Sequence, residues 1–520
     1  MTDRQRVVAV TGGGGGIGAA IAQALGRAGD FVVTLDPLVS LDGSQTLPAP
    51  EQTTAVRIVA AGGTARASGV SVTDAAALQK LFTDLADEFG GLDAVVNVAG
   101  ISRPTSYTTG SSRDWQDVLA VHLDGYRNVL CAAMPLMAAA GRGHILGVTS
   151  GSGWRSADTG AYGCAKRAVA ALTWQLGRHA PDGVTVNAIS PIAATRMVAV
   201  ALAKTSTSVT GGLSLAAMPS PEDLGALAAH LVADDFATCQ GRVLFAAGSE
   251  IAMIDEPRLI EAVRDTDLPH LLDTATSIAL VPAETHQTTG GGGNARFGSI
   301  LAEPAPAELP RPAAHTCAVA ADSPAVASAV AGALGRRGVS VTTVDEPAGL
   351  AGIPALDAVV IASSSTPSTA AAPGWQRILD EHGDIVAQIH RDARWSRAVA
   401  DLAIATNRPI RLVGLHDATT AGGRSRAQAA AQLARAGRQA TDGLVLPFTI
   451  SAESDAIPAD FIAHLLCSQL TGDLAGAELV TGEGWFGLRN HPRPVGSISF
   501  GGPDVPPWFD TALQEVVQPR

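Results

Sequence analysis

A glycine cluster between an apolar run and an alanine-rich run is the feature that most restricts the fold of this chain. Residues 7–10 are apolar, residues 12–16 are all glycine, and residues 19–28 have the composition of a helix. Glycines permit a tight turn and the close approach of a pyrophosphate, and the N–H groups at the start of a helix bind phosphate oxygens. The order strand, glycines, helix predicts a nucleotide-binding turn, whereas the glycines taken alone are equally compatible with a flexible loop.

An acidic residue follows at the distance expected for a ribose contact. Residues 31–35 form a second, mostly apolar strand that ends at Asp36, about 20 residues after the glycines. A carboxylate there accepts hydrogen bonds from the ribose of an adenine dinucleotide; the alternative is an ordinary aspartate in a surface turn. The glycine turn carries no Arg or Lys that would neutralise a 2′-phosphate, so the sequence favours NAD over NADP unless a basic residue reaches in from elsewhere.

Length and composition are typical of two well-buried domains. The chain has 520 residues, more than one ordinary core holds, and 46% of them are hydrophobic. A net charge of −13 without a basic run argues against nucleic-acid binding. The five cysteines lack the spacing of metal sites, so we expect free thiols, no metal and a reducing, cytoplasmic compartment. No apolar stretch is long enough to cross a membrane, and no signal peptide precedes the first strand, so we expect no membrane partner.

Three short motifs occur twice in the same order, which indicates a duplicated βα fold rather than convergent patterning in an alanine-rich chain. The pairs are Ala24–Gly29 with Ala333–Gly338, Leu92–Val96 with Leu356–Val360, and Trp115–His122 with Trp375–His382. The second copy has residues 321–327, which include a proline, in place of the glycine turn. It also lacks the stretch that corresponds to about residues 39–91. We therefore expect a trimmed second domain with a structural role.

The predicted fold class is α/β, with two tandem Rossmann-like, doubly wound parallel sheets, the second trimmed and without the nucleotide-binding glycines. The sequence predicts an NAD-binding catalytic domain at residues 1–256 and a degenerate structural domain at residues 313–520. Residues 257–312 between them are rich in proline and glycine and are expected to form a linker or an arm along a surface.

A tyrosine and a lysine four residues apart begin an alanine-rich helix in the first copy. Tyr162 and Lys166 are expected one helical turn apart on the same face, and Ser150 follows the preceding strand. An ammonium group favours a nearby phenolate, so Lys166 is expected to lower the pKa of Tyr162, which is ordinarily about 10. Tyr162 would then exchange a proton with an alcohol or carbonyl oxygen that Ser150 orients. An isolated pair of this kind would more simply be a packed tyrosine beside a lysine stem.

These motifs together resemble the short-chain dehydrogenase/reductase family over about residues 5–254. The resemblance rests on TGGGGGIG at Thr11–Gly18, NVAG at Asn97–Gly100, Ser150, YGCAK at Tyr162–Lys166 and NAISP at Asn187–Pro191. It implies a seven-stranded parallel Rossmann sheet, hydride transfer between the nicotinamide of NAD and a carbinol carbon, and proton transfer by Tyr162. Lys166 would also hold the nicotinamide ribose. The cofactor-binding residues that it implies are Thr11, Gly12, Gly16, Ile17, Gly18, Asp36, Asn97, Ala99, Gly100, Tyr162, Lys166, Pro191, Ile192 and Thr195.

The sequence departs from the family pattern in several places, among them Ser71, which stands where the family usually has an aspartate that contacts adenine. His122 stands where the family has a catalytic asparagine; it either holds the water of a proton relay or is a packed histidine. The interval from serine to tyrosine is one residue shorter than usual, which leaves Thr149 and Ser152 as alternatives to Ser150. Ile192 replaces a glycine, and its backbone is still expected to reach the carboxamide of nicotinamide.

The substrate site is expected beyond the carboxyl ends of the strands, between residues 152–159 and 198–219. The second stretch is largely apolar, which favours a hydrophobic alcohol or ketone such as a 3-hydroxyacyl-CoA, an alicyclic alcohol or a sterol. Arg155 and Arg196 either meet the phosphates of a CoA ester or are solvated. Two other functions stay open: a non-enzymatic NAD-binding sensor or regulatory protein, and an epimerase or dehydratase.

The resemblance also suggests how the two copies are arranged. Members of the family usually dimerise through the helices that follow the fourth and fifth strands. The second copy is expected to occupy the partner's place within one chain, as an intramolecular pseudo-dimer, and two such chains would pair as a homodimer. This arrangement predicts an apolar face on the helix from Arg424 to Arg438.

Overall fold

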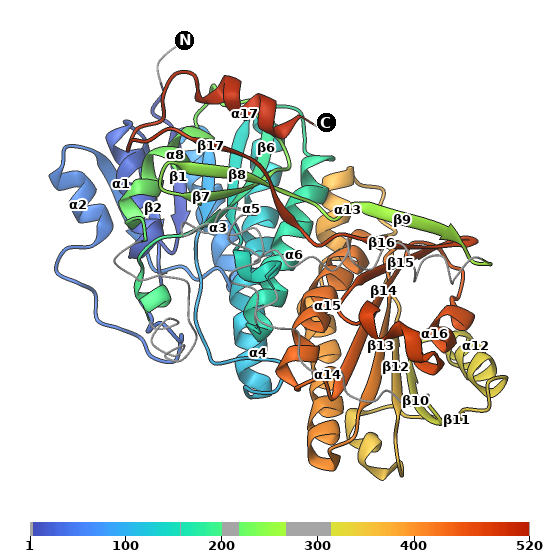
Figure 1. Ribbon diagram of the computed structural model, residues 1–520. Helices are drawn as coiled ribbons and strands as arrows, with labels where there is room; N and C mark the ends of the chain where they lie inside the picture. Colours follow the sequence, from blue (N-terminus) through green and yellow to red (C-terminus); the bar gives the residue numbers. More distant parts are fainter. Residues whose placement is uncertain (1–3, 156–157, 200–217, 267–313, 519–520) are drawn as a thin grey trace.

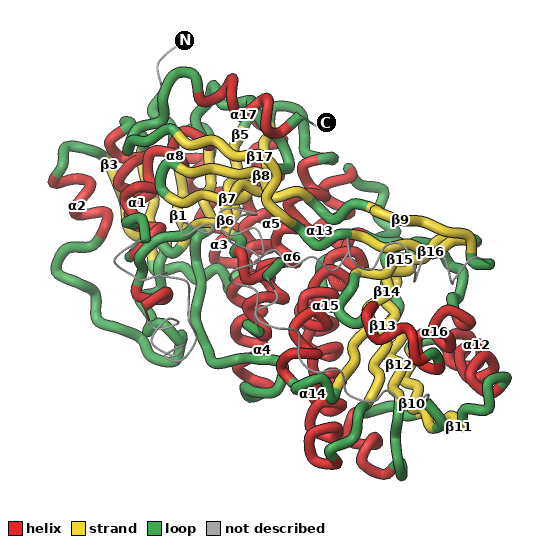
Figure 2. The backbone as a smooth tube through the Cα atoms, viewed as in Figure 1, coloured by secondary structure: helices red, strands yellow, loops and turns green. Residues whose placement is uncertain are grey.

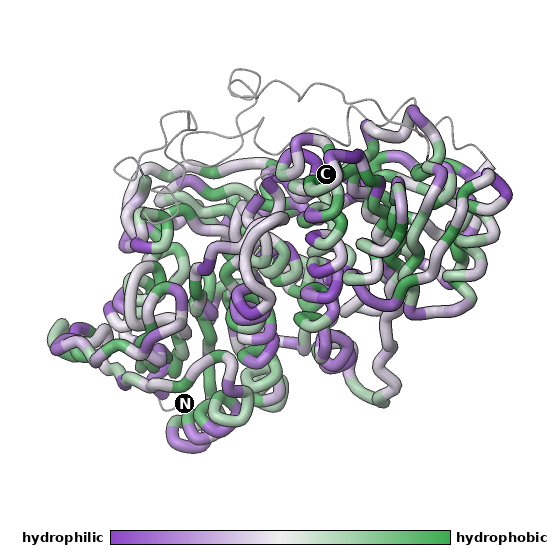
Figure 3. Tube along the Cα trace, turned by 90° about the horizontal axis from the view of Figure 1, so that it is seen from below, coloured by the Kyte–Doolittle hydropathy of each residue, from purple (hydrophilic) through white to green (hydrophobic). Residues whose placement is uncertain are grey.

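Two parallel-dominated sheets lie side by side, each with helices on both faces (Figures 1 and 2). The computed structural model describes residues 4–155, 158–199, 218–266 and 314–518. The two Rossmann-like sheets confirm the predicted fold class. Hydrophobic segments run along the strands and purple, hydrophilic segments along many outer turns (Figure 3). None of the helices within these ranges is long and apolar enough to cross a bilayer.

The first sheet holds the N-terminal half of the chain in the order β17-β8-β7-β6-β5-β4-β1-β2-β3. Strands β1 to β7 are parallel and mostly apolar, as expected for strands that helices cover on both faces. Its strands are β1 (Val7–Thr11), β2 (Phe31–Leu35), β3 (Thr64–Ser68), β4 (Ala94–Asn97), β5 (Gly143–Val148), β6 (Val184–Pro191), β7 (Val243–Ala247), β8 (Glu250–Asp255) and β17 (Arg493–Ser499). Its helices are α1 (Gly16–Arg27), α2 (Thr54–Ala60), α3 (Ala75–Phe89), α4 (Ser112–Leu119), α5 (Gly125–Ala140), α6 (Gly160–Gly177), α8 (Gly225–Leu231) and α17 (Phe509–Val517).

The second sheet repeats this strand order without a counterpart of β3, as β9-β16-β15-β14-β13-β12-β10-β11. Only a short 3-10 turn at Pro347–Gly352 lies between β11 and β12, where the first domain has α2, β3 and α3 between β2 and β4. The strands are β9 (Leu259–Arg264), β10 (Thr316–Ala321), β11 (Ser340–Thr343), β12 (Ala358–Ser363), β13 (Ile410–Asp417), β14 (Val445–Ala452), β15 (Glu478–Gly482) and β16 (Trp485–Arg489). The helices are α12 (Pro324–Gly335), α13 (Gly374–Glu381), α14 (Ile385–Thr406), α15 (Ala421–Ala440) and α16 (Ala459–Cys467).

The two sheets exchange their outermost strands. Strand β9 follows β8 along the chain but pairs antiparallel with β16 of the second sheet. Strand β17 follows β16 but pairs antiparallel with β8 of the first sheet, and α17 packs beside it in the same core (Figure 1). The predicted boundaries are therefore wrong in two places, because residues 259–264 are a strand and residues 493–517 belong to the first domain. An edge strand satisfies its hydrogen bonds on either sheet, so its sequence does not reveal which sheet it joins.

The rest of the expected linker, residues 267–312 with its glycine and proline runs, lies outside the described residues, as do residues 156–157 and 200–217 of the expected substrate site.

Helices of the two domains pack against one another in corresponding pairs. Helix α6 lies along α15, α4 contacts α14, and α5 contacts α13. Helix α15 is buried along most of its length, as its composition of small residues allows. Its face toward α6 is not simply apolar, however, because Ser425, Gln428 and Gln432 form hydrogen bonds across the interface.

The exchange predicts that the C-terminal helix stabilises the N-terminal domain. Phe509 is 1% exposed within the core of the first sheet, whereas its neighbour Trp508 is 49% exposed. We expect Phe509→Ala to lower the free energy of unfolding by about 3 kcal/mol, because it leaves a cavity in that core. Trp508→Ala serves as the matched control and should change it by less than about 0.5 kcal/mol. Urea unfolding of the full chain measures both values, and equal effects of the two substitutions would contradict the assignment of α17 to the first core.

Candidate active site

The glycine cluster forms a turn between β1 and α1 in which several positions fit only glycine. Gly12 and Gly16 adopt left-handed φ values of +65° and +52°. A Cβ on Gly18 would lie 2.2 Å from the carbonyl oxygen of Gly12. Because α1 begins at Gly16, the N–H groups of its first turn are left for a ligand at this end. The turn has the geometry of the predicted phosphate-binding loop.

Asp36 is fixed beside this turn by two backbone donors. Its carboxylate accepts hydrogen bonds from the N–H of Gly14 at 3.0 Å and from the N–H of Leu38 at 2.8 Å. A Cβ on Gly14 would lie 2.5 Å from Oδ2 of Asp36, so a side chain at position 14 would displace the carboxylate. The acid thus lies at the end of β2 next to the glycines, as predicted.

A buried threonine joins the ends of β1 and β4. The hydroxyl of Thr11 donates to Oδ1 of Asn97 at 2.8 Å and accepts from the N–H of Ala99 at 3.2 Å. A Cβ on Gly12 would lie 2.9 Å from the backbone of Ala99, so the two strand ends pack closely. The glycine turn and the NVAG motif at Asn97–Gly100 therefore form one rim of the site.

His122 lies in a five-residue π-helix, Ala120–Asp124, between α4 and α5. Nε2 of His122 is 2.8 Å from the carbonyl oxygen of Ile101, and the ring lies edge-on to that of Tyr162, with centroids 5.0 Å apart. Burial lowers the pKa of His122 to about 3, so the imidazole is neutral at physiological pH. Its Nδ1 is buried without a hydrogen-bond partner among the described residues. The histidine is packed, and it also keeps one unused acceptor beside the tyrosine.

Ser150, Tyr162 and Lys166 come together at the carboxyl end of β5. The side chains of Ser150 and Tyr162 are hydrogen-bonded. Nζ of Lys166 donates to the carbonyl oxygen of Val148 at 2.6 Å and lies 5.7 Å from the centre of the Tyr162 ring. The hydroxyl of Thr149 instead donates to the carbonyl oxygen of Lys166 at 2.5 Å. Of the alternatives raised by the short interval, the structure places Ser150 against the tyrosine.

The pKa values of the pair differ from the expectation that Lys166 acidifies Tyr162. Burial raises the pKa of Tyr162, and the hydrogen bond from Ser150 opposes that rise only in part. Burial also lowers the pKa of Lys166 to about 7. The expected lowering of the tyrosine pKa is absent from this structure because the amine is bonded to Val148 and desolvation of the phenol dominates.

Residues after β6 also approach the glycine turn. Thr195 lies there, with its methyl carbon 3.8 Å from the position of a Cβ on Gly16. The N–H of Ile192, the residue after Pro191, donates to the carbonyl oxygen of Ala246 at 2.8 Å and extends the pairing of β6 with β7. The expected backbone contact of Ile192 with a carboxamide is therefore restricted to its carbonyl group.

Arg196 brings a positive charge to the glycine turn. One of its terminal nitrogens lies 3.4 Å from the position that a Cβ on Gly15 would take. The glycine turn itself contains no basic residue, and the sequence leaves Arg196 either at the phosphates of a CoA ester or solvated. The one feature of the sequence that places Arg196 near the glycine turn is its position next to Thr195, an implied cofactor-binding residue.

The second domain holds the loop that follows Ser150. Nε2 of Gln432 on α15 donates to the carbonyl oxygen of Arg155 at 2.8 Å, and Arg435 donates to the carbonyl oxygen of Trp154. These contacts are not visible in the sequence, because Gln432 and Arg435 resemble any exposed residues of a polar helix.

A buried charged cluster also joins the helix of Tyr162 and Lys166 to the second domain. Arg167, the residue after Lys166, and Glu478 on β15 are both fully buried, with a nitrogen and an oxygen 2.6 Å apart. Nε of Arg167 donates to Gln428 at 2.9 Å, and Nη1 lies 3.0 Å from Nδ1 of His491. Burial lowers the pKa of Arg167, and the Glu478 carboxylate opposes this shift, so the guanidinium is held in a dry interior by its partner.

Comparison with known proteins places this geometry in a family. A family model for short chain dehydrogenases matches residues 6–205. The short-chain reductase protein NovJ of Streptomyces niveus is 36% identical over 200 residues, which cover 38% of this chain and 72% of that protein. Peroxisomal multifunctional enzyme A of Dictyostelium discoideum is 34% identical over 200 residues, which cover 37% of this chain and 44% of that protein.

A solved structure extends the likeness in fold to the second domain. The crystal structure of the N-domain of a bacterial malonyl-CoA reductase with NADP matches 92% of this chain and 97% of that chain, with a TM-score of 0.66 and 15% identity. The residues that the family model matches include the glycine turn, Ser150, Tyr162 and Lys166. The chain belongs to the short chain dehydrogenase family.

Proposed function

We propose that the chain is an oxidoreductase that interconverts a secondary alcohol and a ketone at the first domain, with NAD as cofactor. The observation that carries the proposal is the hydrogen bond between Ser150 and Tyr162, with Lys166 one helical turn away, at the same end of the sheet as the glycine turn. A bound nicotinamide would supply or accept the hydride. A sensor that only binds a nucleotide has no need of such a proton-transfer group.

Each polar side chain has a separate part in the proposed reaction. Ser150 donates a hydrogen bond to the substrate oxygen, and Tyr162 exchanges the proton of the hydroxyl group. A lysine with a pKa of about 7 gains and loses a proton near neutral pH, so Lys166 is suited to return that proton toward the solvent. The unused Nδ1 of His122 is an acceptor for a water in the same path, the role that an asparagine has in the family.

The proposed cofactor is NAD because the Asp36 carboxylate occupies the edge of the turn. Backbone donors fix it there, where it would bind ribose hydroxyls and repel a 2′-phosphate. NADP is the second candidate, since Arg196 lies across the same turn and the malonyl-CoA reductase domain of similar fold holds NADP. The implied cofactor-binding residues lie at this turn, at or just after the ends of β1, β2, β4 and β6, and on α6.

The proposed substrate is a hydrophobic secondary alcohol or ketone, and a 3-hydroxyacyl thioester is the first candidate within that class. The name of one protein of similar fold, a malonyl-CoA reductase domain, includes a CoA thioester and supports a thioester substrate. Arg196 offers a positive charge for a phosphate at the edge of the site.

The proposed location is a reducing compartment, which suits the five cysteines because all of them are free thiols.

The second domain is proposed to be a degenerate copy of the first in the position of a dimer partner. The equal strand order, the reciprocal exchange of β9 and β17, and the packing of α6 on α15 support this interpretation. Two chains would then associate as a dimer of pseudo-dimers.

Replacement of Tyr162 by Phe separates the enzyme from a sensor. We expect the variant to lose turnover by at least about 100-fold, because general acid–base catalysis contributes that much, while NAD binding is retained. NADH formation at 340 nm with secondary alcohols and 3-hydroxyacyl thioesters measures turnover, and calorimetry measures NAD binding. The control is Tyr126→Phe, which also loses a buried hydroxyl, bonded to Thr173. Equal turnover of the wild type and the Tyr162 variant would refute the proposed role.

Replacement of Asp36 by Ser tests the choice of cofactor. We expect the ratio of kcat/KM with NADP to that with NAD to rise about tenfold or more, because the ribose loses a charged acceptor and the 2′-phosphate loses a repelling charge. Asp42→Ser, an exposed acid on the neighbouring loop, is the matched control. A ratio that does not change, or a wild type that prefers NADP, would favour recognition through Arg196 instead.

A further inference from the structure

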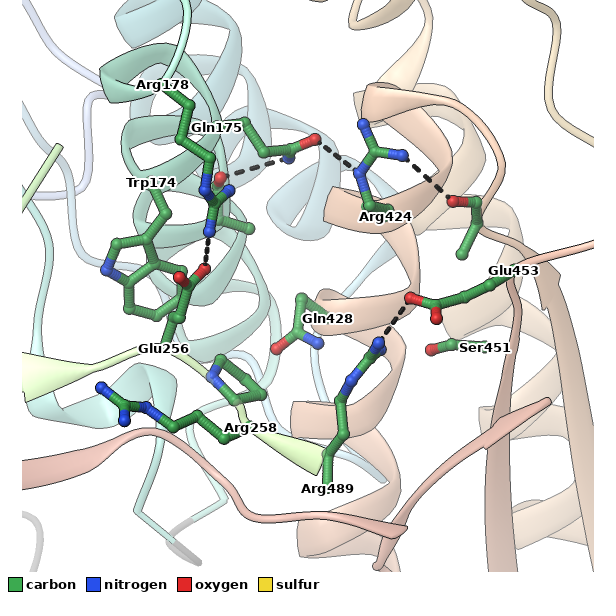
Figure 4. A pocket seen from close by; sticks show the side chains of 13 residues that line it. Trp174, Gln175, Arg178, Glu256, Arg258, Arg424, Gln428, Ser451, Glu453 and Arg489 are labelled. Atoms are coloured by element: carbon green, nitrogen blue, oxygen red, sulfur yellow. Dashed lines mark hydrogen bonds and ion pairs between the residues drawn. The ribbon is translucent and has the colours of Figure 1, made fainter. Parts of the chain in front are cut away.

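A cavity of about 310 Å³ lies between the two domains (Figure 4). Trp174, Gln175 and Arg178 at the end of α6 form one wall, and Arg424 and Gln428 on α15 form the opposite wall. Trp174 lies twelve residues beyond Tyr162 on the same helix, a distance of about 18 Å along its axis. The cavity is therefore separate from the candidate active site.

The cavity lies at the carboxyl ends of strands in the second sheet. Ala418 directly follows β13, Ser451 is near the end of β14, and Glu453 follows it. Ligands of open α/β sheets bind at these ends of the strands. The second domain has lost its glycine turn, but it has kept a cavity at this edge, closed by α6 of the first domain.

Basic side chains are in excess in the cavity lining, which contains four arginines and two glutamates. Arg178 forms an ion pair with Glu256, and Arg489 forms one with Glu453 (Figure 4). Arg258 is paired with Asp255 at 2.6 Å, outside the lining. The lining as a whole is thus positive, in a chain whose net charge is −13.

Arg424 forms no ion pair with a carboxylate among the described residues, although Glu381 and Glu453 lie close enough to offset part of its charge. Its Nε donates to Oε1 of Gln175 at 2.9 Å, and Nη1 donates to the backbone carbonyl oxygens of Ala418 and Thr419 at 3.4 and 3.2 Å. Burial lowers its pKa, although the group stays a cation at neutral pH. An exposed guanidinium whose hydrogen bonds go to neutral acceptors can receive an anion from the cavity.

A buried hydroxyl group supplies the second, independent observation. Ser451 is 1% exposed, and its Oγ has no hydrogen-bond partner among the described residues. It lines the cavity next to Glu453, on the wall across from Gln428 (Figure 4). A buried hydroxyl without a partner costs stability, and a ligand oxygen in the cavity would remove that cost.

We propose that this cavity binds a small organic anion with a phosphate or carboxylate group, which Arg424 and the hydroxyl of Ser451 recognise. Its volume lies at the lower end of the range for ligand pockets and suits a small metabolite rather than a dinucleotide. Gln428 lines the cavity and also accepts a hydrogen bond from Arg167. Gln428 therefore connects the bound anion to the buried charged cluster of Arg167 and Glu478. The site thus joins the two domains.

Binding of inorganic phosphate and of succinate to the full chain tests the proposal without any measurement of turnover. We expect saturable binding of one of them, with one site per chain, by calorimetry, and a melting temperature that rises with its concentration. The probe that binds identifies the recognised group. Absence of saturable binding for both probes would overturn the proposal.

Matched variants locate the bound probe. Arg424→Met should weaken binding at least tenfold, and Ser451→Ala should weaken it severalfold without loss of stability, since that hydroxyl has no partner to lose. Arg196→Gln at the glycine turn and Arg408→Gln, an exposed arginine paired with Asp357, should bind as the wild type does. Weaker binding in Arg196→Gln together with unchanged affinity in Ser451→Ala would place the anion at the glycine turn and overturn the proposal. Ser451→Ala decides the matter if the Arg424 variant does not fold.

Discussion

The buried bond between Arg167 and Glu478 is the interaction on which the arrangement of the two domains depends. Both side chains are fully buried, and further contacts to Gln428 and His491 satisfy the guanidinium. Loss of one partner would leave an uncompensated charge in a dry interior, which is among the most costly changes a fold can suffer. The same helix carries Tyr162 and Lys166, so this bond fixes the candidate active site relative to the second domain.

Other contacts also join the two domains, at the loop after Ser150 and at the edges of the two sheets. Gln432 and Arg435 hold the backbone after Ser150, and the exchanged strands β9 and β17 give each sheet an edge from the other half of the chain. The first domain is therefore incomplete without the chain segments that follow the second, although the second domain carries no glycine turn. The cavity at Arg424 and Ser451 lies within the same interface and gives a small anion access to it.

The sequence allowed the local features of the first domain to be predicted. The glycine turn, the position of Asp36, and the pairing of Ser150 with Tyr162 all follow from short-range order, because each requires a particular residue at the end of a particular strand. The shorter chain between β11 and β12 was visible in the sequence as a shorter interval between matched motifs.

Features that arise between distant segments were not predictable in this way. The edge strands show no sequence preference for one sheet, the position of Arg196 depends on how the chain returns after β6, and Glu478 looks like any acid before the fold buries it. The expectation that Lys166 lowers the pKa of Tyr162 fails for the same reason. Desolvation of the phenol and the bond from Lys166 to Val148 are properties of the packed structure and not of the spacing of the two residues.

A double-mutant cycle on Arg167 and Glu478 tests most directly whether the buried pair holds the two domains together. Unfolding free energies are measured by urea denaturation for Arg167→Met, Glu478→Met and the double variant. Each single variant is expected to lose about 3–5 kcal/mol, because one charge stays buried and unpaired, and the double variant is expected to lose much less than the sum. Single variants as stable as the wild type, or losses that simply add, would contradict it.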